Sequence, residues 1–245
     1  MRKSKFNTLA DSIEGHVQID SLHTSIYATD ASVYREIPLA VIYPKNNSDL
    51  KKILEFSMVH KLSITPRAAG TSLAGQCVTD GIVLDLSKHF INQFNLEVSH
   101  KTIRLEPGVV RDLLNKDIKS DNLFFGPNTS TSNRCNIGGM FGNNSSGTTS
   151  IKYGVTRDKI ISSKGFLPDG SFIEVKPITK KEFQEKLKLN SLEGDIYKYF
   201  NNLFQRKDIE LLLEKGFPKS SIHRRNTGYA IDELYNTSFF KKKSN

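Results

Sequence analysis

The sequence contains little cysteine, and this scarcity argues against two classes of protein. Cys77 and Cys135 are the only cysteines among 245 residues, and neither stands in a CxxC or Cys/His ligand spacing. A disulfide framework or a cysteine-based metal site is therefore not indicated. We expect both side chains to pack as small apolar groups, in a protein of a reducing compartment.

Long apolar runs are also missing from the chain. No stretch approaches the roughly twenty apolar residues that a membrane-spanning helix needs. The N-terminal sequence MRKSKFNTLADS lacks the apolar segment of a secretory signal. We therefore predict no transmembrane segment and a cytoplasmic location.

Clustered charge is scarce, although the overall balance is basic. Lys and Arg total 35 against 26 acidic residues, and the formal charge of +9 at pH 7 favours anionic partners in general. The only basic run, residues 241–243, reads as a solvated tail, and no module signature for nucleic acid is present, so no nucleic-acid partner is expected. The six histidines show no metal-ligand spacing, so no metal is predicted; His223 is compatible with an anionic substrate or with a structural role.

The apolar pattern predicts a first segment of alternating strands and helices with short connections. A hydrophobic content of 37% is enough for one large core or two small lobes. Asn47 or Ser48 is expected to cap a helix with Met58 on its apolar face. The expected strands cover residues 39–43, 62–65, 82–86 and 102–106, and a second helix is expected at residues 111–118.

Beyond residue 150 the pattern changes to a hairpin followed by helices. Asp169-Gly170 is a strong turn signal between strands at 159–166 and 171–175, so we expect an antiparallel pair. Residues 179–215 are helical in pattern, and Gly216-Phe217-Pro218 ends the helices. We interpret as core the aromatic stripe on one side of these helices, formed by Ile196, Tyr199, Phe200, Leu203 and Phe204.

Two loops rich in small residues carry the functional signal. The first loop, residues 66–76 (PRAAGTSLAGQ), begins like a Walker A motif, but Gln76 and Cys77 stand where that motif needs Lys and then Ser or Thr. The second loop, residues 126–147, contains Gly138-Gly139-x-x-Gly142, which fails the G-x-G-x-x-G dinucleotide fingerprint. An ATP or GTP hydrolase and a Rossmann dehydrogenase are both disfavoured.

Main-chain N–H groups in such loops can bind a diphosphate without lysine. Closely spaced Gly, Ala, Thr and Ser permit the tight backbone that an amide nest requires, and Thr71 and Ser72 can add hydroxyl donors. The simpler interpretation is that a glycine-rich loop is only a turn, and Arg67 could pair with a phosphate or with a carboxylate. Two such loops, each after an apolar run, favour one extended cofactor held at two places.

At this point the motifs resemble a known family. Residues 65–76 resemble the pyrophosphate loop of FAD-linked oxidases of the p-cresol methylhydroxylase and vanillyl-alcohol oxidase (PCMH/VAO) superfamily, closest to the D-lactate dehydrogenase and glycolate oxidase flavin subunits, including long forms fused to an iron–sulfur domain. The later matching motifs are Val83-Leu84-Asp85-Leu86, Glu106-Pro107-Gly108-Val109, Gly126-Pro127, Ile137-Gly138-Gly139-Met140, Asn143-Asn144-Ser145-Ser146-Gly147, Lys152-Tyr153-Gly154, Thr156-Arg157-Asp158 and Arg225-Asn226-Thr227-Gly228-Tyr229.

The resemblance implies an α+β fold, a two-lobed PCMH-type FAD-binding domain with a small β-α-β lobe and a larger mixed-sheet lobe. Residues 1–35 would form an N-terminal extension and residues 36–245 the domain, with lobes at 36–100 and 101–245. The first loop would line the diphosphate and the second would approach the isoalloxazine and ribityl groups. Thr71 stands where covalent members have histidine, so non-covalent FAD is predicted. The implied FAD-binding residues are Arg67, Ala68, Ala69, Gly70, Thr71, Ser72, Gly126, Pro127, Gly138, Gly139, Asn143, Asn144, Ser146 and Gly147.

The sequence also departs from the family pattern. Ala68 and Ala69 stand where glycines are frequent, and Asn128-Thr129 replace an Asp-Pro pair. Family enzymes carry a downstream cap domain with the substrate-binding arginine and histidines, so we expect a domain that is incomplete at its C-terminus, with no catalytic residue identified.

The function implied by the resemblance is that of the FAD-binding portion of a 2-hydroxy-acid dehydrogenase of the D-lactate or glycolate type. Its expected partners are a small-molecule 2-hydroxy acid and an electron acceptor, either a quinone, a cytochrome or an iron–sulfur protein or domain. Such a partner would allow peripheral association with the inner membrane. Two alternatives stay open, namely a reductase of the UDP-N-acetylenolpyruvoylglucosamine kind and an inactive flavin-binding module.

Overall fold

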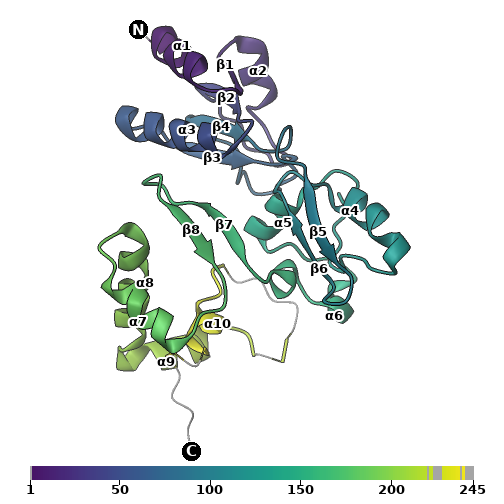
Figure 1. Cartoon of the computed structure of the whole chain (residues 1–245), viewed down its shortest axis with the longest axis vertical. Coiled ribbons are helices and arrows are strands. Elements are labelled where there is room, and N and C mark those ends of the chain that lie inside the picture. The colour runs from purple at the N-terminus through teal and green to yellow at the C-terminus, as the bar shows by residue number, and fades with distance from the viewer. Residues whose placement is uncertain (1, 220, 223–227, 238, 241–245) are drawn as a thin grey trace, which may run out of the picture. The chain divides into compact units, whose positions relative to one another are not determined.

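The computed structural model describes residues 2–219, 221, 222, 228–237, 239 and 240. They divide into two compact units, Met1–Thr149 and Ser150–Asn245, which are described separately (Figure 1). The lobe boundary after residue 100 stays a prediction. His223, the basic run at 241–243 and most of the late motif at 225–229 lie outside the described residues.

The first unit contains a four-stranded sheet in the order β1-β2-β4-β3. Strands β2 (Ala40–Tyr43), β4 (Ile82–Asp85) and β3 (Ile64–Arg67) are parallel, while β1 (His16–Gln18) runs antiparallel to β2. Helix α3 (Asn47–His60) connects β2 to β3, so the predicted β-α-β unit is confirmed. Both central strands are fully buried, because apolar residues alternate between the two faces of the sheet and both faces are covered.

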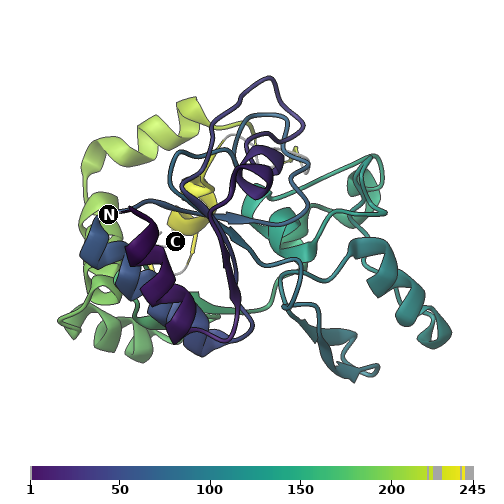
Figure 2. The ribbon, with the colours of Figure 1, turned by 90° about the horizontal axis from the view of Figure 1, so that it is seen from above.

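Residues of the N-terminal segment pack on both faces of this sheet. Phe6, Leu9 and Ile13, on and just after α1 (Arg2–Ser12), pack with Ile42 and Ile53 on the face that α3 also covers (Figure 2). On the opposite face Tyr27, which follows α2 (Ser21–Ile26), packs against the strands. Residues within the segment expected to be an extension therefore contribute to the core of the unit.

The capping of α3 corrects one prediction. Asn46, and not Asn47 or Ser48, is the N-cap, and its side-chain oxygen accepts from the N–H of Asp49 at 2.9 Å. The buried face of the helix runs through Asp49, Ile53 and Ser57, so the expectation for Met58 was also wrong, because its side chain is 43% exposed.

Asp49 connects three segments of the first unit. One carboxylate oxygen accepts from the N–H of Glu14, and the other accepts from Gly15 and Lys45, all at 2.9 to 3.0 Å. The residue is 1% exposed, so these three hydrogen bonds replace the water that the charged group would otherwise bind.

A second core lies in the same unit, formed by a hairpin and short helices. Its elements are β5 (Gln93–Glu97), β6 (Thr102–Leu105), α4 (Arg111–Asp117), the 3₁₀ turn η1 (Lys119–Asp121) and α5 (Ile137–Asn143). Val109, Leu114, Ile137 and Met140 are its buried centre. The strand near 102–106 and the helix near 111–118 are confirmed, whereas α5 lies inside the segment that we expected to be a loop.

The second unit contains the predicted hairpin, which follows a short helix and a 3₁₀ turn in the chain. Strands β7 (Ser163–Phe166) and β8 (Phe172–Val175) pair antiparallel across the Asp169-Gly170 turn. The helices of this unit are α6 (Ser150–Tyr153), the 3₁₀ turn η2 (Thr156–Lys159), α7 (Lys180–Lys188), α8 (Leu192–Phe204), α9 (Lys207–Gly216) and α10 (Ile231–Tyr235).

The aromatic stripe on α8 is only partly core. Phe204 is buried and lies 4.6 Å from Phe240 between ring centroids, while Phe183 stacks on Phe239 at 5.0 Å. Tyr199 is 63% exposed, so the interpretation of the stripe as core was wrong for that residue.

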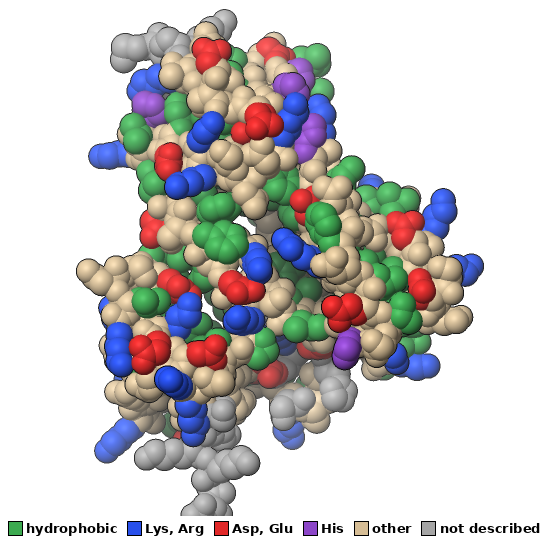
Figure 3. Space-filling view, in the orientation of Figure 1, with side chains coloured by type: hydrophobic (Ala, Val, Ile, Leu, Met, Phe, Trp, Pro, Cys, Tyr) green, Lys and Arg blue, Asp and Glu red, His purple; other side chains and the backbone are tan. Residues whose placement is uncertain are grey.

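Surface and composition add few special features. Basic and acidic side chains alternate over the face drawn in Figure 3.

Cys77 and Cys135 are buried and unbonded to each other, as their expected packing role requires. Within the described ranges, no group of three or more potential metal ligands occurs and no helix is long and apolar enough to cross a bilayer.

Candidate functional site

The first loop leaves β3 at the carboxyl end of the parallel strands. Gly70 and Gly75 adopt positive φ values of 65° and 70°, a conformation that side chains other than glycine rarely adopt. The hydroxyl of Ser72 accepts from the N–H groups of Ala74 and Gln76 and donates to the side-chain oxygen of Gln76 at 2.8 Å. The C-terminal half of the loop is therefore held by its own hydrogen bonds.

The N-terminal half of the loop has main-chain donors to spare. Among the described residues, the N–H groups of Ala69, Gly70, Thr71 and Ser72 donate to no protein atom, although all four residues are partly buried. Successive N–H groups without protein partners, around a glycine of positive φ, are typical of a nest that binds an anion.

Arg67 lies beneath this loop and points back into the protein. Its guanidinium donates to the carbonyl oxygens of Tyr27 at 3.2 Å and Thr29 at 2.9 Å, and it lies 5.0 Å from the centre of the Tyr27 ring. A Cβ at Gly70 would lie 2.9 Å from Cζ of Arg67, so the loop backbone rests on the guanidinium.

The second loop reaches the first loop through helix α5. Gly139 is exposed on this helix, and a Cβ there would have one neighbour within 4 Å, the side chain of Ala68 at 3.1 Å. A second contact joins Nε2 of Gln76 to Oδ1 of Asn143 at 3.4 Å. Residues about seventy positions apart in the sequence thus form one surface, as the idea of a cofactor held at two places requires.

Gly138 and Gly147 have a different environment from Gly139. A Cβ at Gly138 would lie 2.9 Å from Cα of Pro107, whose carbonyl accepts from the Gly138 N–H. A Cβ at Gly147 would lie 2.8 Å from the carbonyl carbon of Asn128. These two glycines allow chain segments to pack closely, whereas Gly139 is exposed and a Cβ there would meet only the side chain of Ala68.

Gly126 and Pro127 are buried supports of the second loop. Arg111 donates through Nε to the carbonyl of Pro127 at 3.2 Å, and the hydroxyl of Thr149 donates to the carbonyl of Gly126 at 2.8 Å. Arg111 escaped the sequence reasoning. An arginine at the start of a helix, shortly before a Gly-Pro pair, gives no local signal of this long-range contact.

The remaining predicted residues follow the end of α5. Asn143 donates to the hydroxyl of Ser145 at 3.0 Å, and Asn144 is the helix C-cap with a φ of 47°. Ser146 is partly buried one residue beyond Ser145. All fourteen predicted residues thus lie in the first unit, and Ala68, Gly139 and Asn143 are those at which the loops meet.

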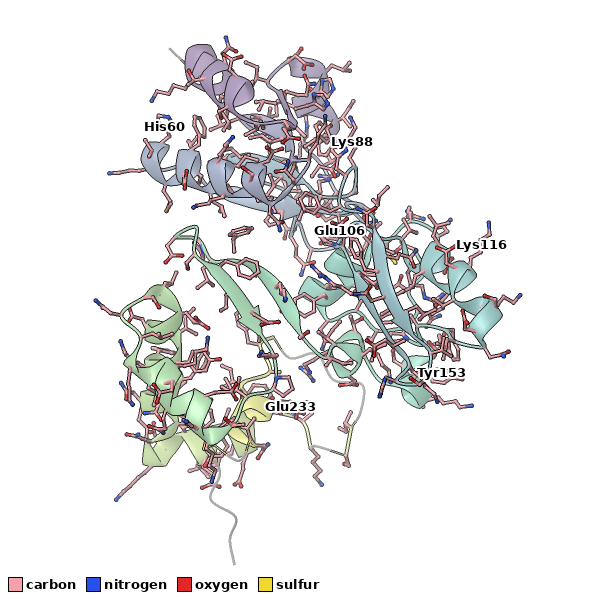
Figure 4. All side chains as sticks on the ribbon, in the orientation of Figure 1. His60, Lys88, Glu106, Lys116, Tyr153 and Glu233 are labelled. Atoms are coloured by element: carbon pink, nitrogen blue, oxygen red, sulfur yellow. The ribbon has the colours of Figure 1, made fainter. Side chains whose placement is uncertain are left out.

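A buried polar network beside the first loop was also missed. The hydroxyl of Tyr27 donates to Asp85 at 2.5 Å and accepts from the hydroxyl of Tyr43 at 3.1 Å, and Asp85 accepts further from the N–H and hydroxyl of Ser87. Burial, followed by the hydrogen bond to Asp85, raises the pKa of the Tyr27 phenol well above its usual range. Lys88, labelled in Figure 4, lies over the ring of Tyr43.

Comparison with known proteins assigns this arrangement to a family. The family model described as "FAD binding domain" matches residues 38–176, which include both loops. The chain belongs to this FAD-binding domain family. The resemblance to the PCMH/VAO type is thereby confirmed, and FAD is the cofactor of the domain.

The curated relatives are much longer proteins, named as a dehydrogenase and as an oxidase subunit. D-2-hydroxyglutarate dehydrogenase of Pseudomonas putida is 33% identical over 223 residues, which cover 90% of this chain and 22% of the relative. Glycolate oxidase subunit GlcD of Bacillus subtilis is 35% identical over 150 residues, covering 60% of this chain and 32% of that one. The chain spans about a fifth of the first relative and a third of the second.

Solved structures share the fold at low sequence identity. The alkyldihydroxyacetonephosphate synthase structure superposes with a TM-score of 0.64 at 16% identity, over 74% of this chain and 36% of the other. The 6-hydroxy-D-nicotine oxidase of Arthrobacter nicotinovorans gives 0.61 at 21% identity, over 70% and 38%. The α+β fold of the PCMH/VAO type is therefore confirmed.

Proposed function

We propose that this chain binds FAD without a covalent bond and forms the FAD-binding part of a flavin-dependent oxidoreductase that oxidises a 2-hydroxy acid. The observation that carries the proposal is the meeting of the two loops at Ala68 and Gly139, beside four N–H groups without protein partners. No single loop of this kind would distinguish a cofactor site from a turn.

The surface fits the two chemically different ends of FAD. The N–H groups of residues 69–72 supply donors for the diphosphate without any charged side chain, and the hydrogen bonds of the Ser72 hydroxyl fix the C-terminal end of this run before binding. Gly139 is exposed beside its contact with Ala68, and because it carries no Cβ a flat ring can approach the helix backbone there.

The redox chemistry belongs to the cofactor. Bound FAD would supply the hydride acceptor for oxidation of the substrate carbon that bears the hydroxyl group. The residues of this chain bind and orient the flavin, and we assign no proton transfer to any of them.

The names of the relatives suggest which 2-hydroxy acid is oxidised. Four relatives named D-2-hydroxyglutarate dehydrogenase align over 85% to 91% of this chain, while those named for glycolate or D-lactate align over 59% to 60%. This difference favours a D-2-hydroxyglutarate type over the D-lactate or glycolate type. The electron acceptor is proposed to be a quinone, a cytochrome or an iron–sulfur centre.

FAD titration of the purified chain tests the binding proposal. We expect quenching of flavin fluorescence on binding, and release of all flavin into the supernatant after acid precipitation, because Thr71 offers no nitrogen for a covalent bond. Flavin that stays with the precipitate would contradict the non-covalent form. Reduction of the bound flavin by D-2-hydroxyglutarate, but not by NADPH, would favour the dehydrogenase. If no hydroxy acid reduces the bound flavin, the result would favour an inactive flavin-binding module.

A pair of glycine variants locates the ring. Gly139→Ala places a methyl group 3.1 Å from the side chain of Ala68, where the two loops meet on the proposed flavin surface. It should weaken FAD binding about tenfold, which corresponds to a loss of about 1.4 kcal/mol. Gly165→Ala is the matched control, because a Cβ there meets no atom within 4 Å. If both variants bind FAD as tightly as the wild type does, Gly139 is not part of the site.

A further inference from the structure

A segment outside the matched family domain contacts the first loop at its N-terminal end. The family match begins at residue 38, yet the carbonyl oxygens of Tyr27 and Thr29 accept both hydrogen bonds of the Arg67 guanidinium. The Tyr27 ring lies under the same guanidinium at 5.0 Å, a distance at which a cation is attracted to an aromatic face. These two donors of Arg67 are thus directed away from the loop amides.

The same segment contacts the C-terminal end of the loop. A Cβ at Gly75 would lie 2.7 Å from Cδ2 of Tyr34, so the tyrosine ring packs directly over this glycine. Close by, Sγ of Cys77 lies 3.7 Å from Oδ2 of Asp30. Residues 27–34 therefore contact the loop both before and after the residues whose N–H groups have no protein partner.

Hydrogen bonds make this segment a fixed support. The N–H of Glu36 donates to the carbonyl of Ala28 at 2.9 Å, and Thr29 and Arg35 form an isolated antiparallel bridge. Ala28 is completely buried. At one end of the segment, Tyr27 is fixed to the sheet by its hydrogen bond to Asp85.

We propose that residues 27–34 set the shape of the first loop. In this proposal Arg67 is a positioning residue that connects the loop to this segment by hydrogen bonds, and it is not a ligand of the phosphates. The inference rests on the proposed FAD site. Its physical basis is preorganisation, because a loop already held in its binding shape loses less conformational entropy when the cofactor binds.

The test is FAD titration of the full chain with variants at Tyr34 and Arg67. Tyr34→Ala removes the ring over Gly75 and should weaken FAD binding about tenfold, which corresponds to about 1.4 kcal/mol, whereas Tyr34→Phe keeps the ring and should bind as the wild type does. Val33→Ala is the matched control, since this neighbouring side chain is 94% exposed. Thermal unfolding of each variant separates loss of fold from loss of loop shape.

Salt dependence distinguishes a positioning residue from a phosphate ligand. Arg67→Met should weaken binding while the dependence of affinity on salt stays that of the wild type, because no ion pair with the diphosphate is lost. A flatter salt dependence in Arg67→Met would mean direct contact and overturn the inference. If the wild type binds FAD and Tyr34→Ala binds it equally tightly, the inference about residues 27–34 is wrong, while the proposed FAD site stands. If the wild type binds no FAD, both proposals are wrong.

Discussion

Gly147→Ala tests whether the second loop needs glycine for packing. A Cβ at this position would lie 2.8 Å from the carbonyl carbon of Asn128 and still closer to its carbonyl oxygen. Asn128 cannot move away easily, because its side-chain oxygen accepts from the N–H and the hydroxyl of Thr149 at 3.1 and 2.7 Å. The carbonyl of the preceding Pro127 is bound by Arg111. A backbone clash with a fixed neighbour is therefore expected.

The size of the effect follows from two opposing contributions. Overpacking against fixed backbone costs about 3 kcal/mol, and replacing glycine by alanine returns up to about 1 kcal/mol through the lower entropy of the unfolded chain. The net loss of about 2 kcal/mol should lower the melting temperature of the first unit by roughly 4 to 8 °C.

Differential scanning calorimetry of Gly147→Ala and of Gly165→Ala provides the measurement. A Cβ at Gly165 meets no atom within 4 Å, so this control should melt close to the wild type. If Gly147→Ala also melts with the wild type, then the packing of Gly147 on Asn128 is not what stabilises the loop, and the division of the glycines into packing and surface positions fails.

Three further changes test the support of the first unit. Tyr27→Phe leaves Asp85 without one of its donors and should lower the free energy of unfolding in urea by about 1 to 3 kcal/mol. Because the pKa of the Tyr27 phenol is raised in the folded state, the wild type should lose stability above about pH 10 more steeply than this variant does. Asp49→Asn removes an acceptor for buried N–H groups and should cost about 3 kcal/mol, and an unchanged urea midpoint would contradict this. Asn46→Ala removes the N-cap of α3 and should lower the free energy of unfolding by about 1 kcal/mol, whereas Asn47→Ala should leave it nearly unchanged. If Asn47→Ala is the more destabilising of the two, Asn47 is the N-cap, as the sequence predicted.

The sequence by itself determined the elements whose signals are local. The apolar runs gave the buried strands β2 and β4, and Asp169-Gly170 gave the hairpin, because alternation and turn chemistry depend on residues close in the chain. The composition of the two loops indicated an amide-lined cofactor site. The family resemblance added FAD.

Only the tertiary structure decided what each loop residue contacts. The guanidinium of Arg67 binds the carbonyl groups of residues some forty positions earlier, which only the packed structure brings within reach of its donors. Gly138 and Gly147 pack on backbone that no local sequence pattern identifies as a neighbour. Helix α5 forms in a glycine-rich segment of low helix propensity because burial of Ile137 and Met140 outweighs that preference. Contacts between distant segments depend on the packing of the whole unit, and no local pattern encodes them.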